Sequence, residues 1–296
     1  MCTQLTPTSG LEAVRHIVKL GASKLIIAVR STEKGETAKR EIERSTNCGL
    51  KVIEVWPLDL CSYASVIAFA ARATSDLSRI DVLLENAGVA MLRWDWAEDN
   101  ELSLTVNVVS TFLLAFLLLP KLRETATKYN TRPNVTFVTS DTHFFVDFKE
   151  KTAPEGIFNH MNEKSNANMD ERYPTSKLLE VYIVREMAAR RPVDTYPVTF
   201  NMVNPGLCKS DLAREGNARI KIMKFLLART TEAGSRTLVH AAGAGPETHG
   251  EYLNMCQVKP TATVVQSPEG QKAQKRLWDE LMDKLEKIEP GVTGNL

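Results

Sequence analysis

The stretch LIIAVRSTEKGETAKREIER, residues 25–44, decides the fold class of this chain because an apolar run leads directly into a polar, helix-like segment. The run LIIAV is apolar at every position, which is typical of a strand covered on both faces of a sheet. The following residues 33–44 are strongly charged with a sparse apolar stripe, which predicts a surface helix. A strand followed by a helix is the repeating unit of a parallel sheet.

The same alternation continues along most of the chain. Further strands are predicted at residues 52–55, 82–84, 135–139 and 198–203, and further helices at residues 63–76, 102–122 and 173–190. Gly, Pro and Asn separate these segments, and no linker rich in Pro, Gly or Ser divides them. We therefore expect one α/β domain over residues 1–296, built on a doubly wound parallel sheet.

Two segments depart from the alternation. Residues 141–172 form a long polar insertion with little periodicity, which we interpret as a loop beside a ligand site. Residues 211–231 contain a helical pattern at 218–227 and suit a substrate lid. The charged segment 271–288 predicts a helix that ends before Pro290.

Composition excludes several classes of partner. The chain has 296 residues with 37 basic and 36 acidic side chains, so its net charge gives no argument for a nucleic-acid partner. Its five cysteines lack CxxC spacing and are interpreted as reduced intracellular thiols, without a disulfide framework or a metal site. We therefore expect a cytoplasmic protein.

No membrane segment is expected either. The start, MCTQLTPTSG, lacks the apolar core of a signal peptide. The most apolar run, residues 112–119, ends at Pro120, whereas a membrane span needs roughly 20 residues. The surrounding helix 102–122 carries a wide apolar stripe that would suit a homodimer interface. Burial under the insertion or the C-terminal helix is the alternative.

The segment YPTSK holds the strongest chemical signal, because Tyr173 and Lys177 lie one helical turn apart on the same face. A free tyrosine has a pKa of about 10. A cation held nearby favours the phenolate and brings that pKa toward neutral. The pair therefore predicts a proton-transfer site, although the same spacing occurs by chance on solvated helices.

Five motifs in order resemble the short-chain dehydrogenase/reductase family, particularly its retinol-dehydrogenase-like and biosynthetic reductase branches, from about residue 10 to about residue 253. They are Asn86-Ala87-Gly88 after the strand RIDVLL, Asn107, Ser140 with His143, Tyr173 with Lys177, and Asn204-Pro205-Gly206 with Ser210. The resemblance implies a Rossmann-like fold with these motifs at the carboxyl ends of the strands, where such sheets bind ligands.

The resemblance also implies roles for four catalytic residues. Tyr173 would exchange a proton with the substrate oxygen, and Ser140 would donate a hydrogen bond to that oxygen. Lys177 would lower the pKa of Tyr173 and hold the cofactor ribose, and Asn107 would position a water. The alternatives are that Ser140 caps a turn and that Asn107 is a buried helical asparagine bonded to backbone.

A local signal favours NADP as the cofactor. Arg30, Ser31 and Lys34 follow the strand LIIAV, where an acidic residue would select the ribose 2′-hydroxyl and an arginine accommodates a 2′-phosphate. A solvated basic start to the helix is the alternative. By resemblance, Asp59 would bind the adenine amino group, and the remaining cofactor contacts would be Gly10, Asn86, Gly88, Tyr173, Lys177, Pro205, Gly206, Cys208 and Ser210.

The start of the chain departs from the family pattern. The family has a central apolar strand and a TGxxxGxG turn, whereas here Gly10 takes the third glycine position and Gln4 and Thr8 take the first two. We therefore expect a shortened or missing first strand. The lost backbone contacts to a pyrophosphate would cost about 1.5–3 kcal/mol each. Glu85 is a second departure, at a position where the family prefers an apolar residue or Asn.

The sequence thus predicts an NADP-dependent oxidoreductase that interconverts a carbonyl and a secondary alcohol on an apolar small molecule, in secondary-metabolite biosynthesis. The departures leave three explanations open. The sequence is a shortened version of a longer reductase, or a redox-neutral isomerase or cyclase, or a non-catalytic binding protein that has lost tight dinucleotide binding.

Overall fold

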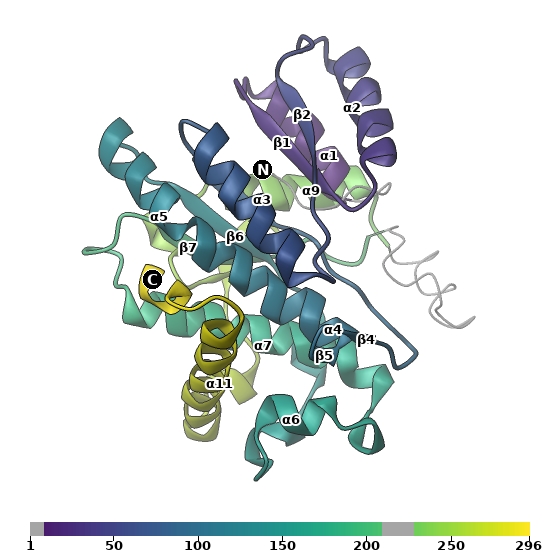
Figure 1. Ribbon diagram of the computed structural model, residues 1–296, viewed down its shortest axis with the longest axis vertical. Helices are drawn as coiled ribbons and strands as arrows, with labels where there is room; N and C mark the ends of the chain where they lie inside the picture. The colour runs from purple at the N-terminus through teal and green to yellow at the C-terminus, as the bar shows by residue number, and fades with distance from the viewer. Residues whose placement is uncertain (1–8, 209–227) are drawn as a thin grey trace.

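A mostly parallel sheet forms the centre of the computed structural model, which describes residues 9–208 and 228–296 (Figure 1). Within those residues one sheet has the strand order β3-β6-β7-β8-β9, and β1 pairs in parallel with β2. The antiparallel pair at the edge is β8 with β9. The strands are β1 (Leu25–Val29), β2 (Ile53–Pro57), β3 (Val82–Glu85), β6 (Asn134–Val138), β7 (Thr199–Asn204), β8 (Tyr252–Asn254) and β9 (Gln257–Lys259).

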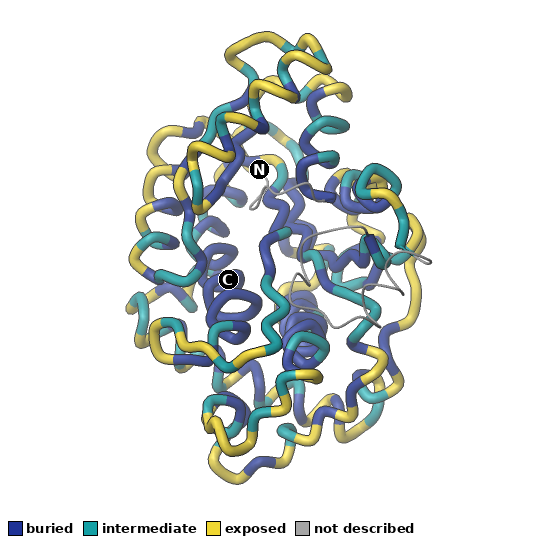
Figure 2. Tube along the Cα trace, turned by 90° about the vertical axis from the view of Figure 1, so that its right-hand side faces the viewer, coloured by how far each residue is buried: buried dark blue, intermediate teal, exposed yellow. Residues whose placement is uncertain are grey.

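Helices cover both faces of the sheet and create two hydrophobic cores. One core joins β1 and β2 to α1 (Ser9–Lys19), α2 (Thr32–Thr46) and α9 (Thr231–Ala242). The other joins the opposite face to α3 (Tyr63–Asp76), α5 (Thr111–Tyr129), α7 (Met169–Arg190) and α11 (Pro268–Ile288). Figure 2 shows the buried residues along the interior of the molecule and the exposed ones at its periphery. The doubly wound α/β architecture predicted from sequence is confirmed.

The predicted elements match the observed ones closely. All five predicted strands and the helices at 33–44, 63–76, 173–190 and 271–288 are present, with ends that shift by a few residues. The sequence missed β8, β9 and α9. The expectation of a shortened first strand falls on residues 1–8, and most of the substrate lid falls on residues 211–227, so both lie outside the described residues.

The apolar segment from Leu102 to Tyr129 is a core helix. It comprises α4 (Leu102–Leu104), a π-helical turn at Thr105–Ser110, and α5. By length and composition alone it could cross a membrane, but 89% of its most apolar window is buried inside the protein. Phe116 packs on Trp278 of α11 with ring centroids 6.0 Å apart. The stripe that suggested a homodimer is therefore covered within one chain, and the homodimer stays a prediction.

The insertion at 141–172 is folded, so the expectation of a long loop was wrong. It contains η2 (Asp141–Phe145), η3 (Lys149–Thr152), α6 (Ile157–Asn162) and η4 (Lys164–Asn166), and the start of α7 at Met169. Phe148, Ile157 and Met161 are buried in the larger core. The Glu280 carboxylate of α11 accepts hydrogen bonds from the backbone N–H groups of Ile157 and Phe158 at 3.0 and 3.1 Å. The C-terminal helix thus fixes the insertion through the orphan donors at the start of α6.

Smaller elements account for the rest of the secondary structure in residues 9–208 and 228–296. A two-stranded antiparallel ribbon joins β4 and β5, and short helical turns flank β8, β9 and α11. These elements are β4 (Trp96–Ala97), β5 (Asn100–Glu101), η6 (Pro246–Thr248), α10 (Thr263–Gln266) and η7 (Val292–Asn295).

Candidate active site

Lys177 is the centre of the candidate catalytic cluster. It projects from α7 and is buried, with 3% of its surface exposed. Its Nζ donates hydrogen bonds to the Val138 carbonyl oxygen of β6 at 2.9 Å and to Glu180 Oε1 at 2.7 Å. The same Nζ lies 5.7 Å from the ring centroid of Tyr173. The i,i+4 pair predicted from sequence is therefore held against the carboxyl end of a central strand.

Ser140 lies directly after β6 and serves two purposes. Its hydroxyl accepts a hydrogen bond from the Thr142 backbone N–H at 3.2 Å and so caps the η2 turn. The hydroxyl also acts to lower the pKa of the Tyr173 phenol. The turn-capping alternative and the effect on Tyr173 are thus both present, and the cap fixes the hydroxyl.

His143 fixes the backbone around Ser140. It is completely buried, and its Nδ1 lies 2.6 Å from the Ser140 carbonyl oxygen. Its Nε2 accepts a hydrogen bond from the Ala262 backbone N–H at 3.3 Å, so the proton is assigned to Nδ1. Burial lowers the pKa of His143, which keeps the ring neutral. The histidine therefore ties the turn after β6 to the segment that precedes α10.

Asn107 lies in the π-helical turn, a feature that often accompanies functional sites. Its Oδ1 accepts from the Val89 N–H at 2.8 Å, and its Nδ2 donates to the Val89 carbonyl at 2.9 Å and to Ser176 Oγ at 2.9 Å. The side chain thus follows the backbone-bonding alternative. It fastens the loop after β3 to α7, and a water-positioning role stays a prediction.

Gly88 of the Asn86-Ala87-Gly88 motif brings that loop close to the lysine. A Cβ atom at Gly88 would lie 3.4 Å from Asn107 Oδ1 and 3.5 Å from Lys177 Nζ. Asn107, Lys177 and the end of β3 therefore surround one small space, as expected for motifs that meet at the carboxyl ends of parallel strands.

The protonation of Tyr173 differs from the sequence expectation. Burial raises its pKa above the ordinary 10.0, the Lys177 charge lowers it, and the Glu180 carboxylate raises it again, with a net upward shift. Lys177 acts in the predicted direction, but it does not bring the phenol toward neutral pH. The expectation was incomplete because the sequence pair was considered without its buried surroundings.

Glu180 is the residue that sequence reasoning missed. It lies on α7 three residues after Lys177 and has 2% of its surface exposed. Burial raises its pKa to about 7, against the lowering influence of Lys177 and of the Thr139 hydroxyl. Glu180 in turn raises the pKa of Lys177 above 10.5, although burial alone would lower it. The i,i+3 spacing was a signal that could have revealed the pair.

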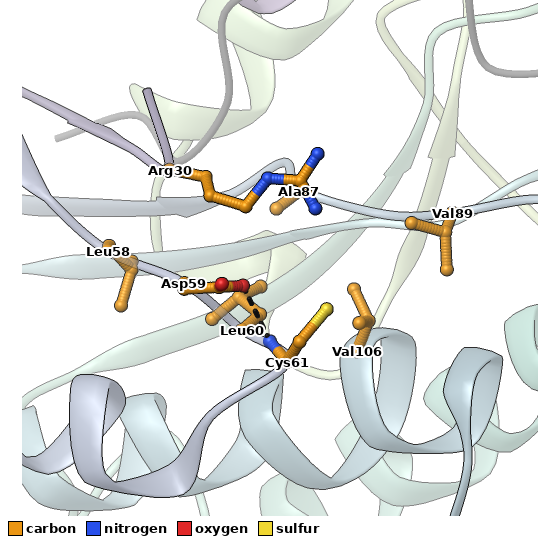
Figure 3. Close-up of a pocket in the computed structure, with 8 residues that line it drawn as sticks. All are labelled: Arg30, Leu58, Asp59, Leu60, Cys61, Ala87, Val89 and Val106. Carbon is orange, nitrogen blue, oxygen red and sulfur yellow. Dashed lines mark hydrogen bonds between the residues drawn. The ribbon is translucent and has the colours of Figure 1, made fainter. Parts of the chain in front are cut away.

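A separate pocket contains the predicted adenosine-binding residues (Figure 3). Arg30 extends across it toward Ala87. Asp59 Oδ1 accepts a hydrogen bond from the Cys61 N–H at 3.0 Å, so one of its oxygens is already engaged. The pocket is lined by Arg30, Leu58, Asp59, Leu60, Cys61, Ala87, Val89 and Val106.

The basic residues beside that pocket stand at the start of α2. Ser31 is the N-cap of this helix, and its Oγ accepts from the Lys34 N–H at 3.4 Å. Arg30 and Lys34 are exposed. A helix N-terminus with two cations beside it suits an anionic group.

The turn after β7 meets the start of α1. Gly206 adopts a φ of +78°, which favours glycine, and its N–H donates to Asn204 Oδ1 at 2.9 Å. Gly10 is buried at the start of α1, and Cys208 Sγ donates to the Pro205 carbonyl oxygen at 3.5 Å. Pro205 precedes Gly206 in this turn, whereas Ser210 lies outside the described residues.

Gly234 of α9 permits this meeting and was not anticipated. A Cβ atom there would lie 2.3 Å from Cys208 Sγ, 3.1 Å from the Pro205 carbonyl oxygen and 3.1 Å from Ser9 Oγ. Only a residue without a side chain lets α9 approach both the turn after β7 and the start of α1. The signal in the sequence was a glycine inside a helical pattern.

The candidate contacts for an extended ligand follow one edge of the sheet. The pocket at Arg30 and Asp59, the Gly88 approach and the Gly206 turn follow the carboxyl edge of the strands, which is where an extended ligand binds to such sheets. Among residues 9–208 and 228–296, no group of three or more His, Cys, Asp or Glu side chains is placed to hold a metal ion.

Comparison with known proteins agrees with the geometry. A family model described as short chain dehydrogenase matches residues 6–143. The short chain dehydrogenase/reductase dmxR8 of Cryptosporiopsis sp. (strain 8999) is 51% identical over 290 residues, covering 97% of this chain and 90% of that protein. The short-chain dehydrogenase anuD of Penicillium roqueforti (strain FM164) is 42% identical over 294 residues, covering 96% of this chain and 76% of that protein.

Solved structures share the fold at lower identity. An uncharacterised protein from Mycobacterium paratuberculosis superimposes with a TM-score of 0.69 at 23% identity, covering 95% of this chain and 92% of that one. A carbonyl reductase from chicken fatty liver with bound NADPH gives a TM-score of 0.62 at 19% identity, covering 87% and 98%. Together, the sequence relatives and the shared fold show that this chain belongs to the short-chain dehydrogenase/reductase family.

Proposed function

We propose that this protein is an NADP-dependent oxidoreductase that reduces a carbonyl group of an apolar small molecule to a secondary alcohol. The observation that carries the proposal is the buried Lys177, which is hydrogen-bonded to β6 and lies beside Tyr173. Ser140 reaches the same phenol from the adjacent turn. A role in secondary-metabolite biosynthesis and a cytoplasmic location belong to the same proposal and rest on the family resemblance and composition.

The cofactor, when bound, supplies the hydride to the carbonyl carbon. Arg30, Ser31 and Lys34 would hold the adenosine phosphate, and Asp59 would face the adenine. Gly10, Asn86, Gly88, Pro205, Gly206 and Cys208 would line the rest of the cofactor site, with Ser210 proposed from sequence alone. Among structural neighbours, the chicken liver enzyme is described with NADPH and a Brucella melitensis 3-ketoacyl reductase with NADH, so the phosphate preference rests on Arg30.

The raised pKa of Tyr173 fits the role of a proton donor in carbonyl reduction. Carbonyl reduction needs a proton donor at the substrate oxygen, and alcohol oxidation needs a base there. A phenol with the ordinary pKa of about 10 is already protonated at neutral pH, and burial and Glu180 raise the pKa of Tyr173 further despite Lys177. Tyr173 would therefore donate its proton to the carbonyl oxygen, while Ser140 donates a hydrogen bond to the same oxygen and stabilises the charge that develops there.

The proposal is tested by NADPH consumption with a panel of apolar ketones. Tyr173→Phe should reduce kcat by about a hundredfold or more, because it removes the proton donor. Tyr129→Phe, at a partly exposed tyrosine that bonds the Ser78 carbonyl, is the control and should leave kcat unchanged. Calorimetry should show that NADPH still binds to Tyr173→Phe.

Two results would contradict the proposal. Unchanged ketone reduction by Tyr173→Phe would exclude this residue as the donor. Absence of saturable NADPH binding, combined with cofactor-independent conversion of a ligand, would favour the redox-neutral isomerase or cyclase instead.

A further inference from the structure

The helix that carries Tyr173 has a break in its hydrogen bonding at the next residue. Pro174 lies inside α7, past the first turn of the helix, which begins at Met169. Proline has no backbone N–H, so the bond that position 174 would donate to the Asp170 carbonyl is missing. The proline ring also disfavours the helical conformation of the residue before it, which is Tyr173. The first turn of α7 and the proposed proton donor therefore need support from outside the helix.

Arg172 provides one support, directly before Tyr173. Its Nε lies 3.6 Å from Glu101 Oε2, and the two side chains are only 2% and 0% exposed. Its guanidinium carbon also lies 5.8 Å from the ring centroid of Trp94, within the range of a cation–π contact. Removing one partner of such a buried ion pair is strongly unfavourable, because the other charge is left without compensation. The pair therefore holds the start of α7 against the segment that contains Glu101.

Glu101 is itself fixed in place by neighbouring residues. Its Oε1 accepts a hydrogen bond from the Ser103 hydroxyl at 3.0 Å, and its backbone N–H donates to Asn162 Oδ1 at 2.9 Å. Glu101 is also the N-cap residue of α4, which leads directly into the π-helical turn that carries Asn107. Arg172 is thus paired with a rigid part of the same segment that supplies a predicted catalytic residue.

Ser176 provides a second support, on the other side of Pro174. Its Oγ donates a hydrogen bond to the Tyr173 carbonyl oxygen at 2.8 Å and accepts one from Asn107 Nδ2 at 2.9 Å. Ser176 and Asn107 are both completely buried. Asn107 in turn bonds both backbone groups of Val89. The serine hydroxyl therefore ties the backbone of Tyr173 itself to the π-helical turn and to the loop after β3.

We propose that Ser176 and Arg172, the latter through its pair with Glu101, are positioning residues that hold Tyr173 in the orientation for proton donation. This inference rests on the proposed function. The two supports lie on either side of Pro174, and both join α7 to the same segment, residues 101–107. Proton donation requires the phenol within hydrogen-bond reach of the substrate oxygen, and a displacement of about 1 Å can slow an enzyme roughly a hundredfold.

Steady-state kinetics of Ser176→Ala test the first support. This variant should lower kcat for ketone reduction by about tenfold or more and change KM by less than about twofold, because orientation of the donor matters in the transition state. The matched control is Thr125→Val in α5. The Thr125 hydroxyl is also buried, donates to the Lys121 carbonyl at 2.8 Å and accepts from the Ile80 N–H at 3.0 Å. Both variants should lose similar stability, but the control should keep its kcat.

A double variant tests the second support. Arg172→Gln/Glu101→Gln removes both charges together, so that neither is left buried without a partner. It should also lower kcat by about tenfold or more with little change in KM. The control is Arg190→Gln/Glu186→Gln, which removes the ion pair at the other end of α7, where Nε and Oε1 are 2.9 Å apart. This control should keep the kcat of the unmodified protein.

NMR tests the positioning without any need for activity. In protein labelled with ¹³C at the ζ carbon of tyrosine, the Tyr173 signal should shift or broaden in Ser176→Ala and in Arg172→Gln/Glu101→Gln, because the ring is no longer held in one orientation. The two controls should leave that signal where it is in the unmodified protein. If the unmodified protein reduces no ketone with NADPH, the proposed function fails, and the NMR result still decides whether these residues position Tyr173.

Two results would overturn the proposal. An unchanged kcat together with an unchanged Tyr173 signal would remove the positioning role of whichever support the variant lacks. An equal loss of kcat in Thr125→Val, or in Arg190→Gln/Glu186→Gln, would show that the effect follows general stability and not the placement of Tyr173.

Discussion

The start of α2 and the middle of α7 both carry charged side chains, but those of α2 are exposed to solvent whereas those of α7 are buried. Arg30 and Lys34 are exposed. Lys177 and Glu180 are almost completely buried, and each changes the protonation of its neighbours. The comparison shows that the exposed cations can select a ligand, whereas the buried charges determine which groups carry protons.

The largest effect is expected from breaking the buried pair. Lys177→Met leaves Glu180 without its counter-charge and should lower the free energy of unfolding by about 3 kcal/mol at neutral pH. Because burial raises the pKa of Glu180 above its ordinary 4.5, protonated Glu180 is favoured in the folded state. The variant should therefore lose stability progressively as the pH rises from 4.5 through neutral. Urea denaturation across this range measures the loss.

A pair with the same spacing provides the control. Lys121 and Glu124 are also three residues apart, with Nζ and Oε2 at 3.0 Å, but the Glu124 side chain is 49% exposed. Breaking this pair with Glu124→Gln should cost less than about 1 kcal/mol. The double variant Lys177→Met/Glu180→Gln should recover most of the stability. A pH-independent loss in Lys177→Met, or no recovery in the double variant, would show that the buried pair lacks the proposed electrostatic role.

An intermediate loss of stability is expected at Gly234, where α9 packs on the turn after β7. Gly234→Ala introduces a Cβ atom that overlaps Cys208 Sγ and presses on the Pro205 carbonyl. It should cost about 1–3 kcal/mol of stability and weaken NADPH binding, since the turn after β7 must shift. Thermal denaturation and calorimetry measure both. Gly243→Ala, at the end of the same helix, has room for its Cβ and is the control. Equal behaviour of the two variants would contradict the close-packing argument.

The smallest effect, on cofactor preference, is expected at Arg30, which is exposed and lines the pocket of Figure 3. Arg30→Ala should reduce the preference for NADPH over NADH by about 1 kcal/mol, roughly fivefold in affinity, because an exposed charge contributes weakly. NADH affinity should stay unchanged. Arg40→Ala, on the same helix and bonded to Thr37, is the control and should alter neither affinity. Equal binding of the two cofactors by the unmodified protein would remove the basis for assigning NADP.

The sequence predicted the elements that local patterns determine. The run LIIAV is buried at every position of β1, as a strand covered on both faces must be. The insertion was misjudged because its elements are short: α6 spans only Ile157–Asn162, and η2, η3 and η4 are single 3-10 turns, so none is long enough to show a clear period. The three-residue strands β8 and β9 are too short to give a pattern, and they depend on pairing with β7 and with each other.

In the candidate site too, local features were predicted and features that depend on tertiary contacts were not. Tyr173 and Lys177 were predicted because one helix turn sets their spacing, and that spacing is local. The raised pKa of Tyr173 was not predicted, because it depends on burial and on Glu180. Glu85 was noticed only as a departure from the family, and its burial depends on the pairing of β3 with β6. Tertiary contacts, rather than spacing, decide where the protons reside.

The ionisation of Tyr173 tests the central claim most directly, because the account requires this residue to be the proton donor. Tyrosine labelled with ¹³C at the ζ carbon can be followed by NMR across a pH titration, and Tyr173→Phe assigns the signal. The account predicts a pKa above the ordinary 10.0 in the unmodified protein, and a lower pKa in Glu180→Gln, in which the opposing carboxylate is gone. A Tyr173 signal that reports phenolate at neutral pH would contradict it.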